Sequence, residues 1–219
     1  FDRHGERASR HKARIKYLVN KIGIEEVLRL VAEERLALGY SSFPINYDAV
    51  PLKQNISGTS FTTFKISDNK KYQDWIFSNV FEQKQQGFYG VNIKVLLGNV
   101  SSQTARELVS LVNTYATDDI RVTVNQGLLL KFVSKEALPA LFKALDKLGL
   151  AEPGFDSVAD ITACPGTDTC NLAISNSTNI SVELEKVIYA EYPELIYNHD
   201  IKIKISGCMN ACGQHSLAH

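Results

Sequence analysis

The four cysteines of this sequence fall into two pairs, and each pair lies in a glycine-containing loop toward the C-terminal end. Cys164 and Cys170 form a C-x5-C pair, and Cys208 and Cys212 form a C-x3-C pair. Thiolates are the natural ligands of iron in iron–sulfur clusters, and a [4Fe–4S] cluster needs four of them. We therefore predict that the two loops converge on one cluster, which indicates a redox protein.

Zinc, disulfide bonds and unrelated burial could also account for the cysteines. Zinc binds four thiolates, but its paired ligands are usually two to four residues apart, and the five residues of the first pair exceed that. Disulfides suit small secreted domains, whereas this chain has 219 residues and no secretory signal. Unrelated buried cysteines would not share a loop setting. Spacing alone ranks the cluster first, zinc second and unrelated cysteines third.

The residues around the cysteines favour close packing of the loops. Pro165 and Gly166 bend the first loop, and Gly207 and Gly213 flank the second pair. Glycine allows the backbone to approach closely, so that N–H groups can donate to cluster sulfurs. The alternation of isoleucines over residues 201–205 predicts a strand that leads directly into the second loop.

The composition is typical of a folded globular protein with no net charge. Hydrophobic residues make up 44% and charged residues 22%, and Lys+Arg and Asp+Glu both count 24. No basic field is present to recruit nucleic acid or an anionic membrane. Apolar runs are too short for a membrane span and the N-terminus has no signal core, so we expect a cytoplasmic protein. The missing initiator Met suggests part of a longer chain.

The N-terminal third is predicted to be helical and then irregular. Residues 1–39 carry helical apolar spacing, with Gly23 as a stop between two helices. Four arginines also fall at helical spacing and could bind carboxylates or form a solvated face paired with glutamates: Arg3, Arg7, Arg10 and Arg14. Residues 41–79 indicate a linker with short strands, including an edge strand over 59–66.

Residues 87–149 show the clearest pattern. Alternating apolar residues predict strands at 91–95, 120–124 and 128–133, and a turn at 125–127 joins the last two as a hairpin. Helical spacing predicts helices after Ser101 and over 138–148. Strand–helix–strand–strand–helix is most of a ferredoxin-like split βαβ unit. Another helix is expected around 182–188, weakened by the Ser/Asn/Thr run at 175–179.

Four stretches together resemble the sirohaem nitrite and sulfite reductases. Residues 162–173 and 205–215 are similar to the family's C-x5-C and G-C-x-N-x-C segments, with Met209 in place of a usual Pro and Ala211 in place of a frequent Gly. Residues 121–126 resemble its R-x-T-x-N-Q strand and turn. His4–Arg7 through Lys12–Tyr17 resembles the segment joining its two halves. The resemblance covers nearly the whole chain and is weakest over residues 41–79.

The resemblance implies an α+β fold in four parts. Residues 1–40 would be the helical segment that ends the family's first half, and residues 41–86 a linker with short strands. Residues 87–158 would form a ferredoxin-like half-domain. Residues 159–219 would form a nitrite/sulfite reductase cluster-binding α+β domain, truncated at its C-terminus.

The resemblance also implies the cofactors, a [4Fe–4S] cluster and sirohaem. By position Cys164, Cys170 and Cys208 would ligate cluster iron alone. Cys212 would ligate the cluster and bridge to the sirohaem iron, and Asn210 would lie beside the macrocycle. Two further cofactor contacts are expected with open alternatives: Lys84, in a Gln-rich stretch that could equally be a solvated loop, and Gln126, which could simply belong to a good turn.

The implied function of the whole protein is six-electron reduction of sulfite to sulfide or nitrite to ammonia. Electrons would come from ferredoxin or a flavoprotein, and neither the anion nor the donor is fixed by the sequence. The substrate-binding Arg and Lys are expected in the family's first half, so no catalytic residue is assigned here and this piece alone is expected to be inactive. The alternative function is a non-enzymatic module, either stabilised by zinc on four cysteines or carrying electrons.

Overall fold

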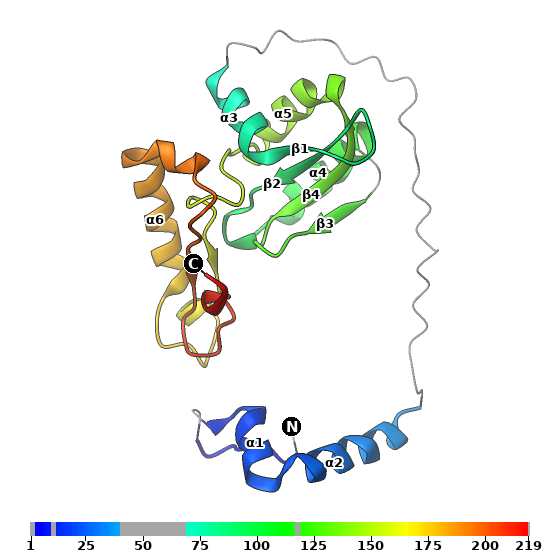
Figure 1. The fold of residues 1–219 in the computed structure, drawn as a ribbon, viewed down its shortest axis with the longest axis vertical. Coiled ribbons are helices and arrows are strands. Elements are labelled where there is room, and N and C mark those ends of the chain that lie inside the picture. The colour runs from blue at the N-terminus through cyan, green and yellow to red at the C-terminus, as the bar shows by residue number, and fades with distance from the viewer. Residues whose placement is uncertain (1–2, 10–11, 40–68, 117–118, 219) are drawn as a thin grey trace. The chain divides into compact units, whose positions relative to one another are not determined.

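The computed structural model describes residues 3–9, 12–39, 69–116 and 119–218, and the chain divides into two compact units, Phe1–Pro51 and Leu52–His219. The smaller unit contains helices α1 (Ile15–Ile22) and α2 (Ile24–Ala37) (Figure 1). Gly23 separates them with φ +81°, a backbone conformation that favours glycine. The predicted stop at Gly23 is therefore confirmed.

The start of the first helix differs from the prediction. Residues 3–9 form turns and bends, and the helix begins only at Ile15, so no helical arginine stripe exists over the described residues. This stretch offers no apolar face to bury, and an isolated helical turn is unfavourable without such packing. Arg3 instead pairs with Glu34 at 2.5 Å, both side chains being exposed; Arg10 lies outside the described residues.

The larger unit is built on a four-stranded antiparallel sheet in the order β1-β2-β4-β3. Its strands are β1 (Val80–Glu82), β2 (Phe88–Ile93), β3 (Ile120–Val122) and β4 (Leu128–Ser134). Its helices are α3 (Lys70–Asn79), α4 (Ser102–Tyr115) and α5 (Leu138–Lys147). The sequence β2–α4–β3–β4–α5 is the predicted split βαβ unit, and β1 adds a fourth strand on the far side of β2.

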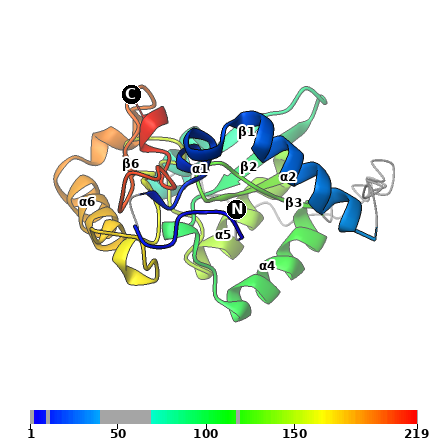
Figure 2. The same cartoon turned by 90° about the horizontal axis from the view of Figure 1, so that it is seen from below.

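The helix ends and the core of this sheet follow from the sequence. Ser101 caps α4 by accepting a hydrogen bond from the backbone N–H of Thr104 at 3.0 Å. Pro139 lies in the first turn of α5, where its missing N–H costs nothing. α4 and α5 lie next to each other along the sheet (Figure 2). Their apolar faces meet the strands in one core that includes Val91, Ile93, Leu108, Val112, Leu130, Leu141 and Leu145.

The segment predicted to be a linker is only partly described. Residues 41–68, including the edge strand expected over 59–66, lie outside the described residues, and the rest forms α3, β1 and the following loop. Helix α3 is held by Trp75, which is fully buried and lies 5.3 Å from the Phe142 ring between centroids. Tyr72 and Ile76 pack against the same core, so the helix has an apolar i, i+3, i+4 spacing that sequence reasoning overlooked.

The last part of the chain contains a short parallel pair and one long helix. Strands β5 (Thr162–Ala163) and β6 (Lys204–Ile205) pair with each other, and α6 (Ser177–Glu191) packs beside them (Figure 1). Short 3-10 turns complete the fold: Leu96–Gly98, Lys135–Ala137, Gly166–Asp168, Pro193–Tyr197 and His215–Leu217. None of the helices in the described part of the chain is long and apolar enough to cross a membrane.

Strand β6 is shorter than the alternation over residues 201–205 predicts. Ile203 and Ile205 pack against a small core around Ile161 and Ile188, whereas Ile201 is 52% exposed. The alternating pattern therefore reports which side chains are buried, while pairing covers only the last two residues.

Candidate functional site

The parallel pair β5–β6 presents both cysteine loops. Thr162 lies opposite Lys204 and Ala163 opposite Ile205, and Cys164 follows β5 directly. The backbone N–H of Cys164 donates to the carbonyl of Ile205 at 3.1 Å. Because parallel strands end at the same edge, the two loops emerge side by side, as the sequence predicts.

Glycines allow these loops to touch. A Cβ on Gly207 would lie 2.7 Å from the Cα of Gly166, and a Cβ on Gly213 would lie 1.9 Å from the carbonyl oxygen of Ile205. The carbonyl of Gly207 accepts from the N–H groups of Ile174 at 2.8 Å and Ser175 at 3.2 Å. The predicted close backbone approach at Gly207 and Gly213 is confirmed.

Cys164 is the most enclosed of the four cysteines. Its sulfur accepts the backbone N–H of Gly207 at 3.0 Å and lies 3.4 Å from Oγ of Ser177, which donates to the Cys164 carbonyl at 2.8 Å. Burial acts to raise the pKa of the Cys164 thiol, but the polar groups around its sulfur, chiefly the Ser177 hydroxyl and the backbone N–H of Gly207, outweigh it and hold that pKa below its ordinary value. The thiolate, which is the form that binds metals, is thereby favoured.

The other three thiols lie progressively closer to the surface. All four cysteines are free of disulfides; Cys170 and Cys208 are half-buried and Cys212 is exposed. Among the described residues, no three Cys, His, Asp or Glu side chains are gathered closely enough to share one metal ion. Four free thiols on two touching loops are nevertheless the donor set that a [4Fe–4S] cluster requires, and ligand binding is what draws such donors together.

Of the two further cofactor contacts expected before residue 159, Gln126 meets the cysteine region and Lys84 does not. The Gln126 side chain donates to the carbonyl of Ala163 at 2.8 Å and accepts its N–H at 3.1 Å. Lys84 is exposed in the loop that joins β1 to β2, next to Phe88. That loop lies at the opposite end of β2 from Ile93, which pairs with Leu128 beside the Gln126 turn.

Asn210 and Cys212 both lie on the exposed side of the second loop. Ala211 between them has φ +58°, a left-handed conformation that is uncommon for a residue with a Cβ and explains the frequent glycine at this position of the family motif. Gln214 follows with φ +60°, and its side chain donates to the carbonyl of Val124 at 3.0 Å and accepts from Nζ of Lys204 at 3.2 Å.

Sequence reasoning missed a buried ion pair between the end of β2 and α6. Nζ of Lys94, which follows β2, lies 2.7 Å from Oε2 of Glu185 on α6 and 3.0 Å from the hydroxyl of Tyr189. Burial acts to lower the pKa of Lys94, but Tyr189 and Glu185 outweigh it, so the pKa is raised and the amine stays charged. Nearby, burial raises the pKa of Asp160 to about 6, despite the Asp156 N–H that it accepts. A partner 91 residues away leaves no local signal.

Ser177 was also missed, although it lies in the Ser/Asn/Thr run at 175–179 that was expected to weaken a helix. Asn176 instead caps α6, accepting the N–H of Asn179 at 3.1 Å, and Ser177 is fully buried against Cys164. Asn followed by a helical pattern is an N-cap signal, and that signal could have placed the helix start.

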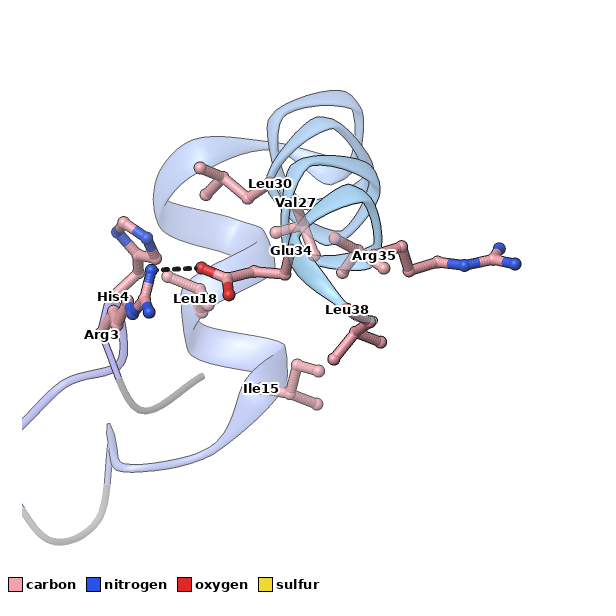
Figure 3. Close-up of a pocket in the computed structure, with 10 residues that line it drawn as sticks. Arg3, His4, Ile15, Leu18, Val27, Leu30, Glu34, Arg35 and Leu38 are labelled. Atoms are coloured by element: carbon pink, nitrogen blue, oxygen red, sulfur yellow. Dashed lines mark hydrogen bonds and ion pairs between the residues drawn. The ribbon is translucent and has the colours of Figure 1, made fainter. Parts of the chain in front are cut away.

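A separate pocket of about 400 Å³ lies within the smaller unit, between α1 and α2 (Figure 3). Apolar side chains line it, with the Arg3–Glu34 pair at its rim. None of the four cysteines lines it, and neither Gln126 nor Lys84 does.

Comparisons with known proteins agree with this architecture. Residues 81–148 match the family model described as the nitrite/sulfite reductase ferredoxin-like half domain. The chain is 27% identical, over 98% of its length, to a chloroplastic ferredoxin–nitrite reductase of Zea mays and covers 34% of it. It is 25% identical, over 98% of its length, to the sulfite reductase [NADPH] hemoprotein beta-component of Bacillus licheniformis and again covers 34%.

A solved structure is similar as well. The NirA protein of Mycobacterium tuberculosis aligns with a TM-score of 0.53 and 25% identity, over 96% of this chain and 35% of that one. The chain therefore spans about a third of the length of the relatives it matches.

Proposed function

We propose that the chain belongs to the nitrite and sulfite reductase family and forms the part of such a reductase that holds a [4Fe–4S] cluster against sirohaem. The observation that carries the proposal is the presentation of four free thiols on two touching loops, with a backbone N–H donated to one sulfur. We place the cluster-binding part at residues 159–219 and the half-domain at residues 87–158, with the helical segment and the linker before them.

We propose different roles for the four cysteines at the two cofactors. We assign Cys164, Cys170 and Cys208 to cluster iron, and Cys212 to both the cluster and the sirohaem iron, with Asn210 beside the macrocycle. The burial order supports this assignment, since Cys164 is enclosed and Cys212 faces solvent. When bound, the cluster would store single electrons and the sirohaem would supply an iron atom that binds the anion.

The residues around Cys164 have a definite task in this proposal. Its burial keeps water from the sulfur, and the N–H of Gly207 is already aimed at that sulfur. Hydrogen bonds to a ligand sulfur disperse its negative charge and favour the reduced, more negative state of the centre. The glycines keep the two loops close enough for this contact.

The relatives suggest the substrate class and the electron donor. Proteins named ferredoxin–nitrite reductase and sulfite reductase both match almost the full chain. We therefore propose reduction of nitrite to ammonia, or of sulfite to sulfide, by six electrons delivered through ferredoxin. The chain covers about a third of these relatives, so this activity is assigned to the complete enzyme and its anion-binding Arg and Lys to the rest of it.

Anaerobic reconstitution of the full chain with ferrous iron and sulfide tests the proposal. We expect iron and sulfide to bind in equal amounts, with the visible absorbance and, after reduction, the paramagnetic resonance of a [4Fe–4S] cluster. Cys170→Ser and Cys208→Ser should lose it, while Met209→Ala, a change of a neighbouring side chain that is 69% exposed, should keep it. Stoichiometric zinc with no cluster would refute the proposal in favour of a zinc module.

A further inference from the structure

The turn between β3 and β4, residues 123–127, is closed by its own hydrogen bonds. Thr123 donates its N–H to the carbonyl of Gly127 at 2.9 Å and accepts the N–H of Gly127 on Oγ1 at 3.0 Å. Gln126 has φ +64°, a conformation that residues other than glycine, asparagine and aspartate adopt at a cost. A Cβ on Gly127 would lie 2.6 Å from the carbonyl oxygen of Ile93, so the turn also sits tightly against β2.

Gln126 uses both ends of its amide on a single residue of the cysteine region. The N–H groups of Thr162 and Cys164 donate to the carbonyls of Ile203 and Ile205, on the side of β5 that faces β6. The N–H and carbonyl of Ala163 therefore point to the other edge of β5, where the Gln126 amide meets both, at 3.1 and 2.8 Å. The side chain takes the place of a neighbouring strand on that edge and satisfies two buried backbone groups.

Two further side chains tie the same turn to its surroundings. Gln214, two residues beyond Cys212, donates to the carbonyl of Val124 at 3.0 Å. Asn125 donates to Oδ1 of Asp156 at 2.8 Å. The turn thus contacts the residue that precedes the first cysteine and a residue just after the last one.

We propose that the 123–127 turn is the positioning element of both cysteine loops, with Gln126 fixing the first loop and Gln214 the second. The N–H and the carbonyl of Ala163 each bind one end of the Gln126 amide, so this side chain acts on the loop that carries Cys164. The inference rests on the proposed function only in that the positioned thiols hold the cluster.

The first test measures backbone hydrogen exchange in the full chain without cofactor. Gln126→Asn keeps a residue that tolerates the left-handed turn but is one methylene too short to make both contacts. We expect exchange at Ala163 to become about five- to tenfold faster, as loss of one backbone acceptor implies, with Val91 and Leu130 unchanged. Gln214→Ala should loosen the second loop and leave Ala163 protected, because Gln126 is retained.

Gln103→Ala is the matched control, because Gln103 lies on the exposed surface of α4 and bonds to Glu107 at 3.1 Å. It should leave exchange at Ala163 unchanged. Wild-type exchange at Ala163 in Gln126→Asn would overturn the inference.

The second test compares the reconstituted wild-type and Gln126→Asn chains under conditions in which their melting temperatures are equal. It measures the lifetime of the cluster and its paramagnetic resonance signal. We expect Gln126→Asn to shorten the cluster lifetime several-fold and broaden its signal, which a purely structural loss of stability would not do. If the unaltered chain takes up no cluster but the exchange result holds, the proposed function fails and the positioning role stands. If the cluster forms and its lifetime and signal are unaltered in Gln126→Asn, the positioning role fails.

Discussion

Removing one partner of the buried Lys94–Glu185 pair should destabilise the protein far more than removing both. The two charged atoms lie 2.7 Å apart, and the side chains are only 5% and 9% exposed. The pair joins the end of β2 to α6, and so connects the half-domain sheet to the helix beside the cysteine loops. Lys94 also contacts Tyr189, through the hydroxyl and through the ring, whose centroid lies 4.8 Å from Nζ.

The expected magnitude follows from burial. A buried charge left without its partner costs about 3–5 kcal/mol, whereas a hydrophobic pair of similar volume is often neutral. The pair forms one wall of a pocket of about 640 Å³, from which water can reach the unpaired group, so we expect the lower end of that range. Lys94→Met and Glu185→Gln should each lose about 3 kcal/mol, and Lys94→Met combined with Glu185→Leu less than about 1.5 kcal/mol.

Urea unfolding at neutral pH, followed by fluorescence of Trp75, measures these free energies. Trp75 is the single tryptophan of the chain and lies fully buried in the core of the larger unit. Lys186→Met is the matched control, since its pair with Glu183 has the same 2.7 Å separation but is 65% and 69% exposed. It should cost less than about 0.5 kcal/mol. The assignment of this cost to burial fails if Lys94→Met costs no more than the control, or if the double variant loses the sum of the single losses.

Three further outcomes are expected. Burial raises the pKa of Asp160 from an ordinary 3.8 to about 6 against the charge of Lys94. The contribution of Asp160 to the free energy of unfolding is therefore present below pH 3.8, and about 3 kcal/mol is lost as pH rises through 6. Asp160→Asn should flatten the pH dependence of stability in urea between these values, and an unchanged slope would contradict this. Gly213→Ala should prevent cluster uptake in iron analysis, because its Cβ would meet the Ile205 carbonyl at 1.9 Å, while Gly39→Ala, with open space around its Cβ, should not. Sirohaem added to the chain should bind substoichiometrically by absorbance titration, since the chain covers 34% of its relatives; a tight equimolar complex would refute that expectation.

The half-domain was predictable because its signals are local. The strand pattern over 128–133, the cap at Ser101 and the helical spacing over 138–148 depend on neighbours within a few residues, and the structure places β4, α4 and α5 accordingly. The arginine spacing before Ile15 was equally regular but had no apolar face to bury, and the described residues of that stretch form no α-helix. Periodicity predicts an element only when the repeated side chains have something to pack against.

The thiol donors of the candidate site were predictable from the sequence, whereas the residues that hold the cysteine loops in place were not. Thiol identity and loop glycines indicate the candidate donors, because both are properties of single residues and their immediate neighbours. Gln126 was noticed as a turn residue or cofactor contact, yet its partner Ala163 lies on another strand, 37 residues away. Ser177 looked like a weak helix position and is the neighbour of the Cys164 sulfur. Such pairings exist only after the tertiary fold has formed.

The need for those supports follows from the length of the strands that carry the cysteines. β5 and β6 pair over two residues each, and so short a parallel pair has too few hydrogen bonds to be stable alone. Its outer edge is completed by Gln126, and α6 is joined to the end of β2 through the Lys94–Glu185 pair. The contacts that hold the cysteine loops therefore come from the half-domain, which gives a physical reason for this sheet to accompany the cysteine-bearing segment in one polypeptide.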